Sequence, residues 1–234
     1  YWWAIQGTNT SLTHILEGIP FMSGYIKRMF PPDLSIINRL MVGAAETIQI
    51  AIMGTTLGAL VALPLSFLAA RNVMAVRVVY QATRSLFDVC RAVNEIVWAL
   101  LFVAMVGLGP FPGVLALAVH LVGALGRYFS EAIETANPEV IKAIVATGAN
   151  RTLVVVHGIL SEIKPLIMGY VLYYFEHSVR AATILGLVGA GGIGFELITS
   201  IRLFKSQEVL TTLIVMMLMV VAVDRISAYV RNRI

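Results

Sequence analysis

The sequence predicts an all-α protein, a polytopic bundle of helices that cross a membrane. Of its 234 residues, 59% are hydrophobic and only 13% are charged, and the mean hydropathy is +0.86. A soluble domain has about a quarter of its residues charged, so a globule of this length would have too few charges for its surface. Uncharged runs such as Thr47–Ala70 are long enough to cross about 30 Å of hydrocarbon. An integral membrane protein is therefore the expected class.

The rest of the composition argues against several other classes. Cys90 is the single cysteine, which excludes an intrachain disulfide and a cysteine-built metal site, and we expect it to be a small packing residue. The formal net charge of +4 fits arginines in cytoplasmic loops better than nucleic-acid binding. The four histidines are scattered, and no Ser/His/Asp or metal-ligand arrangement emerges. Catalysis, a bound metal and a nucleic-acid partner are therefore not expected.

Residues 1–38 form a separate N-terminal segment, expected outside the cytoplasm or at the membrane surface. Apolar residues at helical spacing run from Ile15 to Met29, and the prolines of Phe30–Asp33 end the pattern. An amphipathic helix at the interface fits this pattern, and an ordinary soluble connector fits it nearly as well. The chain begins at Tyr1 rather than at Met, so we also expect a sixth span to precede it.

Residues 39–234 are expected to form the transmembrane domain, with five spans. A run without Asp, Glu, Lys or Arg, residues 96–126, is broken in the middle by Gly107–Gly113. Each half is too short to cross a bilayer, so both helices must extend past their nearest charges. Ionisable groups at membrane depth usually face protein or a water-filled cavity, which indicates helices packed around a pathway. The expected spans cover residues 39–70, 83–108, 114–133, 166–188 and 208–223.

A polar-punctuated segment, residues 136–165, lies between two strongly apolar regions and carries clear helix signals. Asn137 is a good N-cap, and Pro138 suits the first helical position, where no backbone donor is needed. Gly148 is placed to end this helix in a left-handed conformation. A second apolar pattern over residues 153–163 predicts another short helix at a sharp angle to the first. Together they would form a loop that projects from the bundle.

The distribution of basic residues orients the bundle. Lysines and arginines near span ends are more numerous on the side that carries residues 136–165, so the positive-inside rule places this loop in the cytoplasm. The N-terminal segment then lies outside. The basic residues of the cytoplasmic side are Arg71, Arg77, Arg84, Lys142, Arg151, Lys164, Arg225, Arg231 and Arg233, and those of the other side are Lys27, Arg28, Arg202 and Lys205.

Gly189–Gly194 formally matches the dinucleotide-binding pattern G-x-G-x-x-G, but its surroundings do not fit such a site. No βαβ pattern surrounds it, and no Asp or Glu follows at about twenty residues further on. We interpret it as irregular or tightly packed backbone at a membrane boundary, which is tolerated where protein covers it or where it lines a cavity. Freedom at positive φ makes a gate plausible at Gly189, Gly191, Gly192 and Gly194.

Polar side chains within the expected spans have two interpretations. Glu176, His177 and Arg180 lie at helical spacing and could form a proton relay or contact an anion, or they could be a satisfied cluster that only stabilises packing. His120 is the one strongly polar side chain in the middle of its span. A helix–helix hydrogen bond is its simpler role, although an anion pathway would also use such a donor.

Several segments resemble the phosphonate permease of ABC transporters, whose close relatives import phosphite or hypophosphite. The likeness covers most of the chain from Met29 onward. It rests on residues 29–33 (MFPPD), 65–72 (LSFLAARN), 97–103 (VWALLFV), 107–117 (GLGPFPGVLAL), 130–134 (SEAIE) and 182–197 (ATILGLVGAGGIGFEL).

Residues 136–165 resemble the cytoplasmic coupling loop of that family. The general pattern of the loop is kept at Ala143, Gly148 and Leu160 and is not kept at Lys142, Ile144, Gly158 and Ser161. Because Lys142 departs from the motif, the resemblance implies no salt bridge from its first position. The resemblance implies contact with a cytoplasmic ATPase through Lys142, Ala143, Ala146, Thr147, Gly148, Ala149, Asn150, Arg151 and Leu160.

The resemblance also implies a helical bundle of the ABC importer permease type in the bacterial inner (plasma) membrane. A second permease copy would complete the pathway, two ATPase subunits would dock on the two loops, and an external substrate-binding protein would deliver the phosphorus oxyanion. ATP and magnesium would be bound by the ATPases, so this chain would have no cofactor and no enzymatic activity of its own. The candidate contacts along the anion's route are His120, Arg127 and Arg180.

Other functions stay open on the residues alone. A secondary transporter driven by an ion gradient would use Glu95, Glu176 and His177 as a relay. A membrane scaffold could bind an ATPase without moving a substrate. A membrane-embedded enzyme is disfavoured because the sequence contains no recognisable catalytic constellation.

Overall fold

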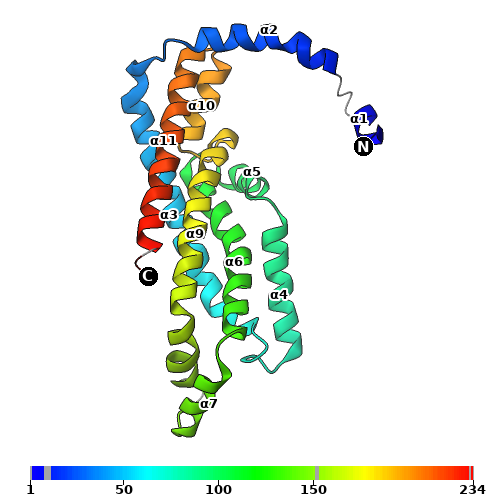
Figure 1. Ribbon diagram of the computed structural model, residues 1–234, viewed down its shortest axis with the longest axis vertical. Helices are drawn as coiled ribbons and strands as arrows, with labels where there is room; N and C mark the ends of the chain where they lie inside the picture. The colour runs from blue at the N-terminus through cyan, green and yellow to red at the C-terminus, as the bar shows by residue number, and fades with distance from the viewer. Residues whose placement is uncertain (1, 8–11, 151–152, 232, 234) are drawn as a thin grey trace.

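The computed structural model describes residues 2–7, 12–150, 153–231 and 233, and the described residues form helices without a strand. Long helices run side by side as an elongated bundle, and the N-terminal segment bends away across one end (Figure 1). The all-α prediction is confirmed. The elements in order are α1 (Trp2–Gly7), α2 (Leu12–Met29), the 3-10 helix η1 (Leu34–Ile36), α3 (Ile37–Leu68), α4 (Arg77–Ala92), α5 (Glu95–Val106), α6 (Pro110–Glu134), α7 (Pro138–Ala146), the π-helix η2 (Val154–Leu160), α9 (Ser161–Leu185), the 3-10 helix η3 (Gly186–Val188), α10 (Ile193–Arg202) and α11 (Ser206–Arg231).

Four helical segments of the described chain are long and apolar enough to cross a membrane, and α4 with α5 adds a fifth if the bent pair is counted as one span. This agrees with the expected number of spans. The four segments are Leu34–Leu68, Pro110–Glu134, Val154–Arg202 and Ser206–Arg231.

The span predicted over residues 83–108 is wrong as a single helix. α4 ends at Ala92, α5 begins at Glu95, and the two helices are bent by 86°. Asn94 makes the corner because its side chain accepts a hydrogen bond from the Ile96 N–H at 2.9 Å and so caps a new helix. The prediction extended the uncharged run that starts at residue 96 back past its nearest charges, and the N-cap signal of Asn94 lay within that extension.

The second helix of the coupling loop is not the separate short helix that was predicted. η2 continues without a break into α9, because Leu160 and Ser161 both keep right-handed helical angles. Gly158 lies within this rod and is buried, and a Cβ there would lie 3.2 Å from the Ile144 side chain; Pro165 also lies within the rod. One helical rod therefore leads from the loop into the bundle, starting well before residue 166.

α3 packs along α6 at the centre of the bundle. Gly54 and Gly58 allow this close approach, since a Cβ on them would lie 2.7 Å from the Cβ atoms of Leu117 and Leu121, respectively. α9 closes the same core through buried residues that include Leu185. The core thus joins α3, α6 and α9 into one unit.

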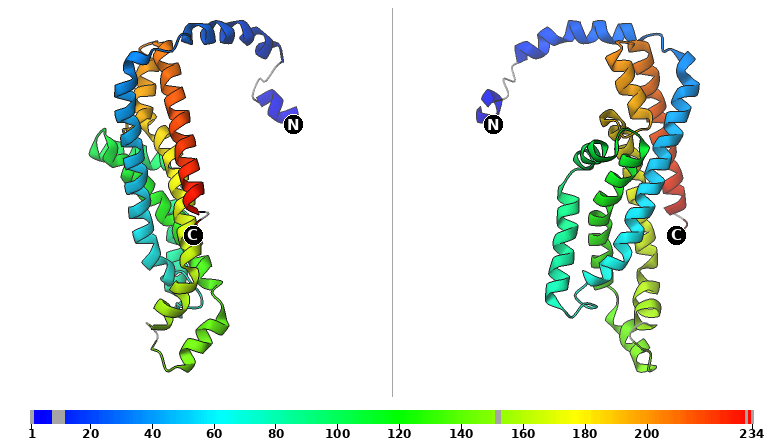
Figure 2. Two further views of the ribbon diagram at one scale, coloured as in Figure 1. Left: turned by 60° about the vertical axis from the view of Figure 1, so that its left-hand side comes forward. Right: turned by 180° about the vertical axis from the view of Figure 1, so that it is seen from behind.

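The two ends of the bundle differ. α2 lies across the end where α10 meets α11, and α7 projects from the opposite end (Figure 1, Figure 2). α2 stops at Met29, before Phe30 and Pro31, as predicted. Asp33 then caps η1 by accepting from the Ser35 N–H at 2.9 Å, and its hydrogen bonds with Ser35 lower the pKa of the Asp33 carboxyl.

Candidate functional site

The coupling loop begins with the helix that its sequence signals predicted. The Asn137 side chain accepts from the Glu139 N–H at 2.9 Å, and Pro138 occupies the first turn. α7 ends at Ala146, and Gly148 has a φ of +80°. Both the N-cap and the left-handed stop are confirmed.

The loop is seated firmly on the bundle. Both carboxylate oxygens of Glu162 lie 3.0 Å from the Asn137 nitrogen, whose N–H they accept. Below this contact, Ile159 and Ile163 are buried against the end of α6 at Ile133. The loop is therefore a packed projection of the bundle and not a free tether.

Most of the residues predicted to contact an ATPase lie on the outside of this projection. Leu160 is an exception, because it is partly buried and packs against the cluster at the base of the loop. Ala149 is also partly buried, and Arg151 lies outside the described residues. The exposed members are Lys142, Ala143, Ala146, Thr147, Gly148 and Asn150.

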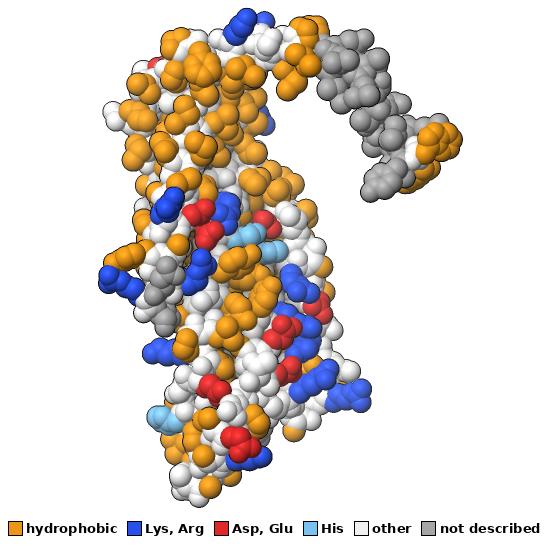
Figure 3. All heavy atoms as spheres, in the orientation of Figure 1, with side chains coloured by type: hydrophobic (Ala, Val, Ile, Leu, Met, Phe, Trp, Pro, Cys, Tyr) orange, Lys and Arg blue, Asp and Glu red, His pale blue; other side chains and the backbone are white. Residues whose placement is uncertain are grey.

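Charged and histidine side chains gather on one face of the bundle, from mid-height towards the loop, whereas apolar side chains cover the part nearer α2 (Figure 3). His120 of α6 turns towards the α4–α5 corner. Its Nδ1 lies 3.3 Å from the Val93 carbonyl oxygen, and its Nε2 lies 3.9 Å from a carboxylate oxygen of Glu95. His177 of α9 is within electrostatic range of both Glu95 and His120. This group joins three helices.

Arg180 is bracketed by two carboxylates. Its guanidinium lies 2.8 Å from Glu176 on the same helix and 3.1 Å from both carboxylate oxygens of Asp224 on α11. Arg180 is also within electrostatic range of His177, so the structure brings it into the neighbourhood of His120. The Arg180 side chain is 43% exposed, and a half-exposed ion-pair group within apolar helices points to a protein partner or to water rather than to lipid.

Arg127 is separate from that group. Its Nε lies 2.7 Å from Glu131 one turn further along α6, and it also interacts electrostatically with Asp88 of α4. The three predicted pathway residues thus form two neighbourhoods, with His120 and Arg180 in one and Arg127 in the other.

A cluster of tyrosines on α6 and α9 was missed by the sequence analysis. The ring of Tyr128 lies 5.0 Å from that of Tyr170 and 5.8 Å from that of Tyr174, and Tyr173 meets Tyr174 edge to face at 5.3 Å. The spacing of Tyr170 and Tyr174, one turn apart, was the available signal. The cluster adds hydroxyl groups and aromatic surface to the polar face.

Arg127 and Arg180, the arginines proposed for the anion's route, each have a carboxylate partner. Among the charged side chains of this face that interact with one another, carboxylates outnumber arginines. An oxyanion that used Arg180 would have to displace Glu176 or Asp224. The face can therefore exchange ion-pair partners, but it does not offer a free cation at these positions. The linked carboxylates are Asp88, Glu95, Glu131, Glu176 and Asp224, and the arginines are Arg91, Arg127 and Arg180.

The glycine segment forms a tight turn between α9 and α10. Gly189, Gly191 and Gly192 have φ values of +88°, +78° and +76°, which L side chains rarely adopt. Gly194 differs, because its φ is not positive and a Cβ there would collide with the Thr183 carbonyl oxygen. We call residues 189–192 the glycine turn; Gly194 is a packing position beside it.

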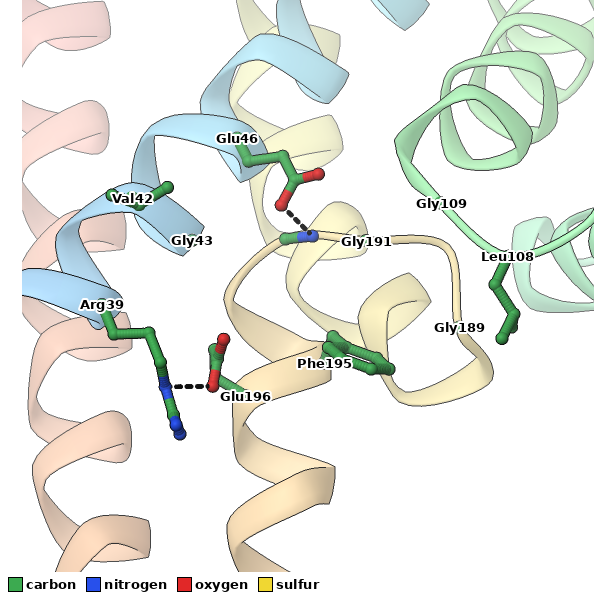
Figure 4. Close-up of a pocket in the computed structure, with 11 residues that line it drawn as sticks. Arg39, Val42, Gly43, Glu46, Leu108, Gly109, Gly189, Gly191, Phe195 and Glu196 are labelled. Carbon is green, nitrogen blue, oxygen red and sulfur yellow. Dashed lines mark hydrogen bonds and ion pairs between the residues drawn. The ribbon is translucent and has the colours of Figure 1, made fainter. Parts of the chain in front are cut away.

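Two side chains of α3 hold the glycine turn, and the sequence analysis did not identify either of them. Glu46 accepts from the Gly192 N–H at 3.0 Å (Figure 4). The Thr47 hydroxyl accepts from the N–H of Ile193, the residue that follows the turn, at 2.9 Å. On its other side, the turn receives a hydrogen bond at 3.0 Å from the Gly109 N–H to the Gly189 carbonyl. A cavity of about 390 Å³ lies beside the turn and is lined by residues of α3, α10 and the turn itself and by Leu108 and Gly109, which connect α5 to α6.

A family model described as "Binding-protein-dependent transport system inner membrane component" matches residues 62–234. Two relatives from Stutzerimonas stutzeri are similar over nearly the whole chain. One is named "Putative phosphite transport system permease protein HtxC"; it is 41% identical over 92% of this chain and 76% of its own length. The other, "Phosphite transport system permease protein PtxC", is 37% identical over 94% of this chain and 80% of its own length.

The fold is also that of solved transporter structures. An inward-facing MetNI methionine ABC transporter chain superimposes with a TM-score of 0.74 at 18% identity, over 86% of this chain and 98% of that chain. A chain of an amino acid ABC transporter gives a TM-score of 0.70 at 16% identity, with the same coverage. The resemblance drawn from the sequence is confirmed. The chain belongs to the family of inner membrane components of binding-protein-dependent transport systems and is a multi-pass permease of that family.

Proposed function

We propose that this permease carries phosphite, a phosphonate or a closely related phosphorus oxyanion inward, driven by ATP. The observation that carries the proposal is the similarity to two proteins named as phosphite transport permeases, at 41% and 37% identity over more than nine-tenths of the chain. A relative named "Phosphate-import permease protein PhnE", from Mycolicibacterium smegmatis, is 35% identical over 98% of this chain and 43% of its own length.

The polar face supports a pathway that a second copy completes. The Arg180 and Asp224 side chains, which form an ion pair, are 43% and 38% exposed. Contact of such exposed charged groups with lipid tails would be energetically costly. A second copy facing this surface would enclose it and leave room for water and substrate. His120, Arg180 and the tyrosines would then line the route, and the oxyanion would exchange places with a carboxylate at Arg180.

The coupling loop supports ATPase docking. It projects beyond the bundle, its outer surface is exposed, and its base is tied to α6 and α9. Two cytoplasmic ATPase subunits would bind ATP and magnesium, close on each other and displace the two loops. A substrate-binding protein would deliver the anion at the other end, and the glycine turn would act as the gate.

A relay driven by an ion gradient has one structural observation in its favour. Of the expected relay residues, Glu95 and His177 are within electrostatic range of each other, and His120 lies beside both, whereas Glu176 pairs with Arg180. Membership of the binding-protein-dependent family favours ATP as the energy source instead.

The test is uptake in proteoliposomes that contain two permease copies, the ATPase and the binding protein. We expect phosphite uptake that requires ATP on the ATPase side and the binding protein on the other. Uptake driven by an ion gradient without ATP hydrolysis would refute the energy source. ATP hydrolysis without uptake of phosphite, hypophosphite, phosphate or methylphosphonate would refute the substrate class.

A further inference from the structure

The coupling loop and the glycine turn lie at opposite ends of the same helix pair. α6 begins beside the turn at Pro110 and leads into the loop, whereas α9 comes from the loop and leads into the turn (Figure 1). α6 has 25 residues and is therefore about 38 Å long. The two helices share a buried core that includes Leu121, Leu125 and Ala182. A displacement at the loop can thus reach the turn along two packed, rigid elements.

α3 is not adjacent to the loop in the chain, although Phe67 near its end packs against the cluster at the base of the loop. Its contacts with the turn are of two kinds. Thr47 is fully buried; it donates to the Gly43 carbonyl at 2.8 Å while accepting from the Ile193 N–H. Glu46 is partly exposed at the edge of the cavity and accepts from the adjacent Gly192 N–H (Figure 4). The Thr47 contact belongs to the core, whereas the Glu46 contact borders the cavity.

The charge of Glu46 is compensated by the turn. Arg39, the cation of the same cavity, pairs with Glu196 at 2.7 Å, and no ion pair among the described residues includes Glu46. The carboxylate instead meets the Gly192 N–H at the positive end of the α10 dipole. Charge-assisted hydrogen bonds of this kind are about twice as strong as neutral ones. Movement of the turn away from α3 would leave the carboxylate without its partner.

Gly191 and Gly192 can lie this close to α3 and to the start of α6 because they lack side chains. A Cβ on Gly192 would lie 2.6 Å from the Thr47 hydroxyl oxygen, and a Cβ on Gly191 would lie 3.1 Å from a Glu46 oxygen and 3.0 Å from the Pro110 backbone. The turn is therefore held between α3 and the start of α6. A displacement of the turn away from α3 would therefore break the contact between Glu46 and Gly192.

We propose that Glu46 is a positioning residue that latches the glycine turn to α3 and sets how easily the coupling loop moves the turn. The inference rests on the proposed function, in which the loop receives the ATPase and the turn is the gate. Thr47 maintains the local fold, and the Glu46–Gly192 bond is the part that releases. Weakening it shifts the resting complex towards the state that ATP binding otherwise produces.

The experiment uses the complete transporter in proteoliposomes, with phosphite as the probe. Glu46→Gln removes the charge, and Glu46→Asp keeps the charge but shortens the side chain by one methylene. Both are expected to raise ATP hydrolysis in the absence of binding protein by about tenfold, because a hydrogen bond to a charged group is worth roughly that factor or more. Glu196→Gln is the matched control; it removes the other carboxylate of the cavity without touching the turn, and hydrolysis should stay at the wild-type rate.

A second measurement reports on the turn itself. Ala190 is fully buried within the turn, so Ala190→Cys in a Cys90→Ser background gives a single thiol whose modification requires the turn to open. Adding Glu46→Gln should speed modification of this thiol in the resting complex, while the melting temperature and the retained ATPase remain those of the parent. A purely structural role would lower the melting temperature together with any change in labelling.

The possible outcomes test the role of Glu46 and the proposed substrate separately. Wild-type hydrolysis and labelling in both Glu46 variants would overturn the latch. If Glu46→Gln does not assemble, the measurements on Glu46→Asp decide the question. If neither variant assembles, Glu46 has a folding role and the latch is overturned. Raised hydrolysis and labelling in a transporter that takes up no phosphorus oxyanion would support the latch and refute the proposed substrate.

Discussion

The coupling loop and the glycine turn show two different ways of building a bend in a helical bundle. The bend of the loop depends on neighbours in the chain, namely the Asn137 cap and the left-handed Gly148. The glycine turn depends on Glu46 and Thr47. Each accepts a hydrogen bond from a backbone N–H that lies 146 positions further along the chain. No atom outside Gly148 and its neighbours lies within 4 Å of a Cβ built there, whereas the turn touches α3 and α6 closely. The loop should therefore tolerate changes of side chain that the turn cannot.

The largest expected effect is at the junction of α9 with the turn. A Cβ on Gly186 would lie 2.6 Å from the Gly191 carbonyl oxygen and 2.6 Å from the Phe195 nitrogen, and these backbone atoms cannot move aside independently. Gly186→Ala should lower the free energy of unfolding by about 1–3 kcal/mol or more. Thermal unfolding and the yield of monodisperse protein in detergent measure this.

Gly169→Ala is the matched control for Gly186→Ala. Gly169 lies in the same helix, α9, with nothing within 4 Å of its Cβ position. This substitution should be neutral or stabilising by up to about 1 kcal/mol, because alanine is the better helix former. If the two variants unfold at the same temperature, the tight packing around the turn is not what distinguishes the two regions.

The next effect concerns the loop. Gly148→Val places a β-branched residue at a φ of +80° in otherwise open space, so backbone strain of about 1–2 kcal/mol is the only expected penalty. We expect ATPase retention on purification to fall about tenfold while the bundle stays folded. Gly148→Asn, which accepts a left-handed conformation more readily, should retain most of the docking. Equal retention by the valine variant and the wild type would show that the left-handed stop does not shape the docking surface.

Arg180→Ala tests the polar face between the two bends. The Arg180 side chain is 43% exposed, so its ion pairs should contribute at most about 1 kcal/mol to stability, and assembly should remain intact. We expect uptake of phosphite to fall about tenfold, equivalent to about 1.4 kcal/mol, if the oxyanion exchanges with a carboxylate there. Arg91→Ala, equally accessible and paired with Asp88 at 3.4 Å, serves as the control and should reduce uptake less. Normal uptake in Arg180→Ala would show that the ion pairs of Arg180 with Glu176 and Asp224 have only a structural role.

The smallest expected effect is at the N-cap of α7. Asn137→Ala removes the side-chain acceptor and should destabilise that helix by about 1 kcal/mol. The contact from Glu162 reaches the backbone N–H of the same residue, so it survives the substitution and limits the loss. Hydrogen exchange of the α7 amides should therefore accelerate only a few-fold, and Asn137→Asp should restore protection. Unchanged exchange in the alanine variant would show that the Glu162 contact alone holds the loop.

Much of this architecture follows from composition and local signals. The scarcity of charges required a membrane protein, because such a surface cannot be solvated, and the number of spans follows from the lengths of the apolar runs. The start and stop of α7 follow from Asn137, Pro138 and Gly148, since caps depend on atoms within a few residues. The family was also recognisable from short segments of the chain, and its model covers residues 62–234.

Contacts between distant segments decided the rest. η2 joins α9 although the pattern suggested a separate helix. The α4–α5 corner is the exception, because the Asn94 cap that makes it is a local signal that the prediction did not use. The partners of Arg180 and the tyrosine cluster depend on which faces of α6, α9 and α11 meet. Glu46 shows the reason most clearly: its role requires a specific N–H group from the far end of the chain, and only the packed tertiary structure brings that group within 3.0 Å.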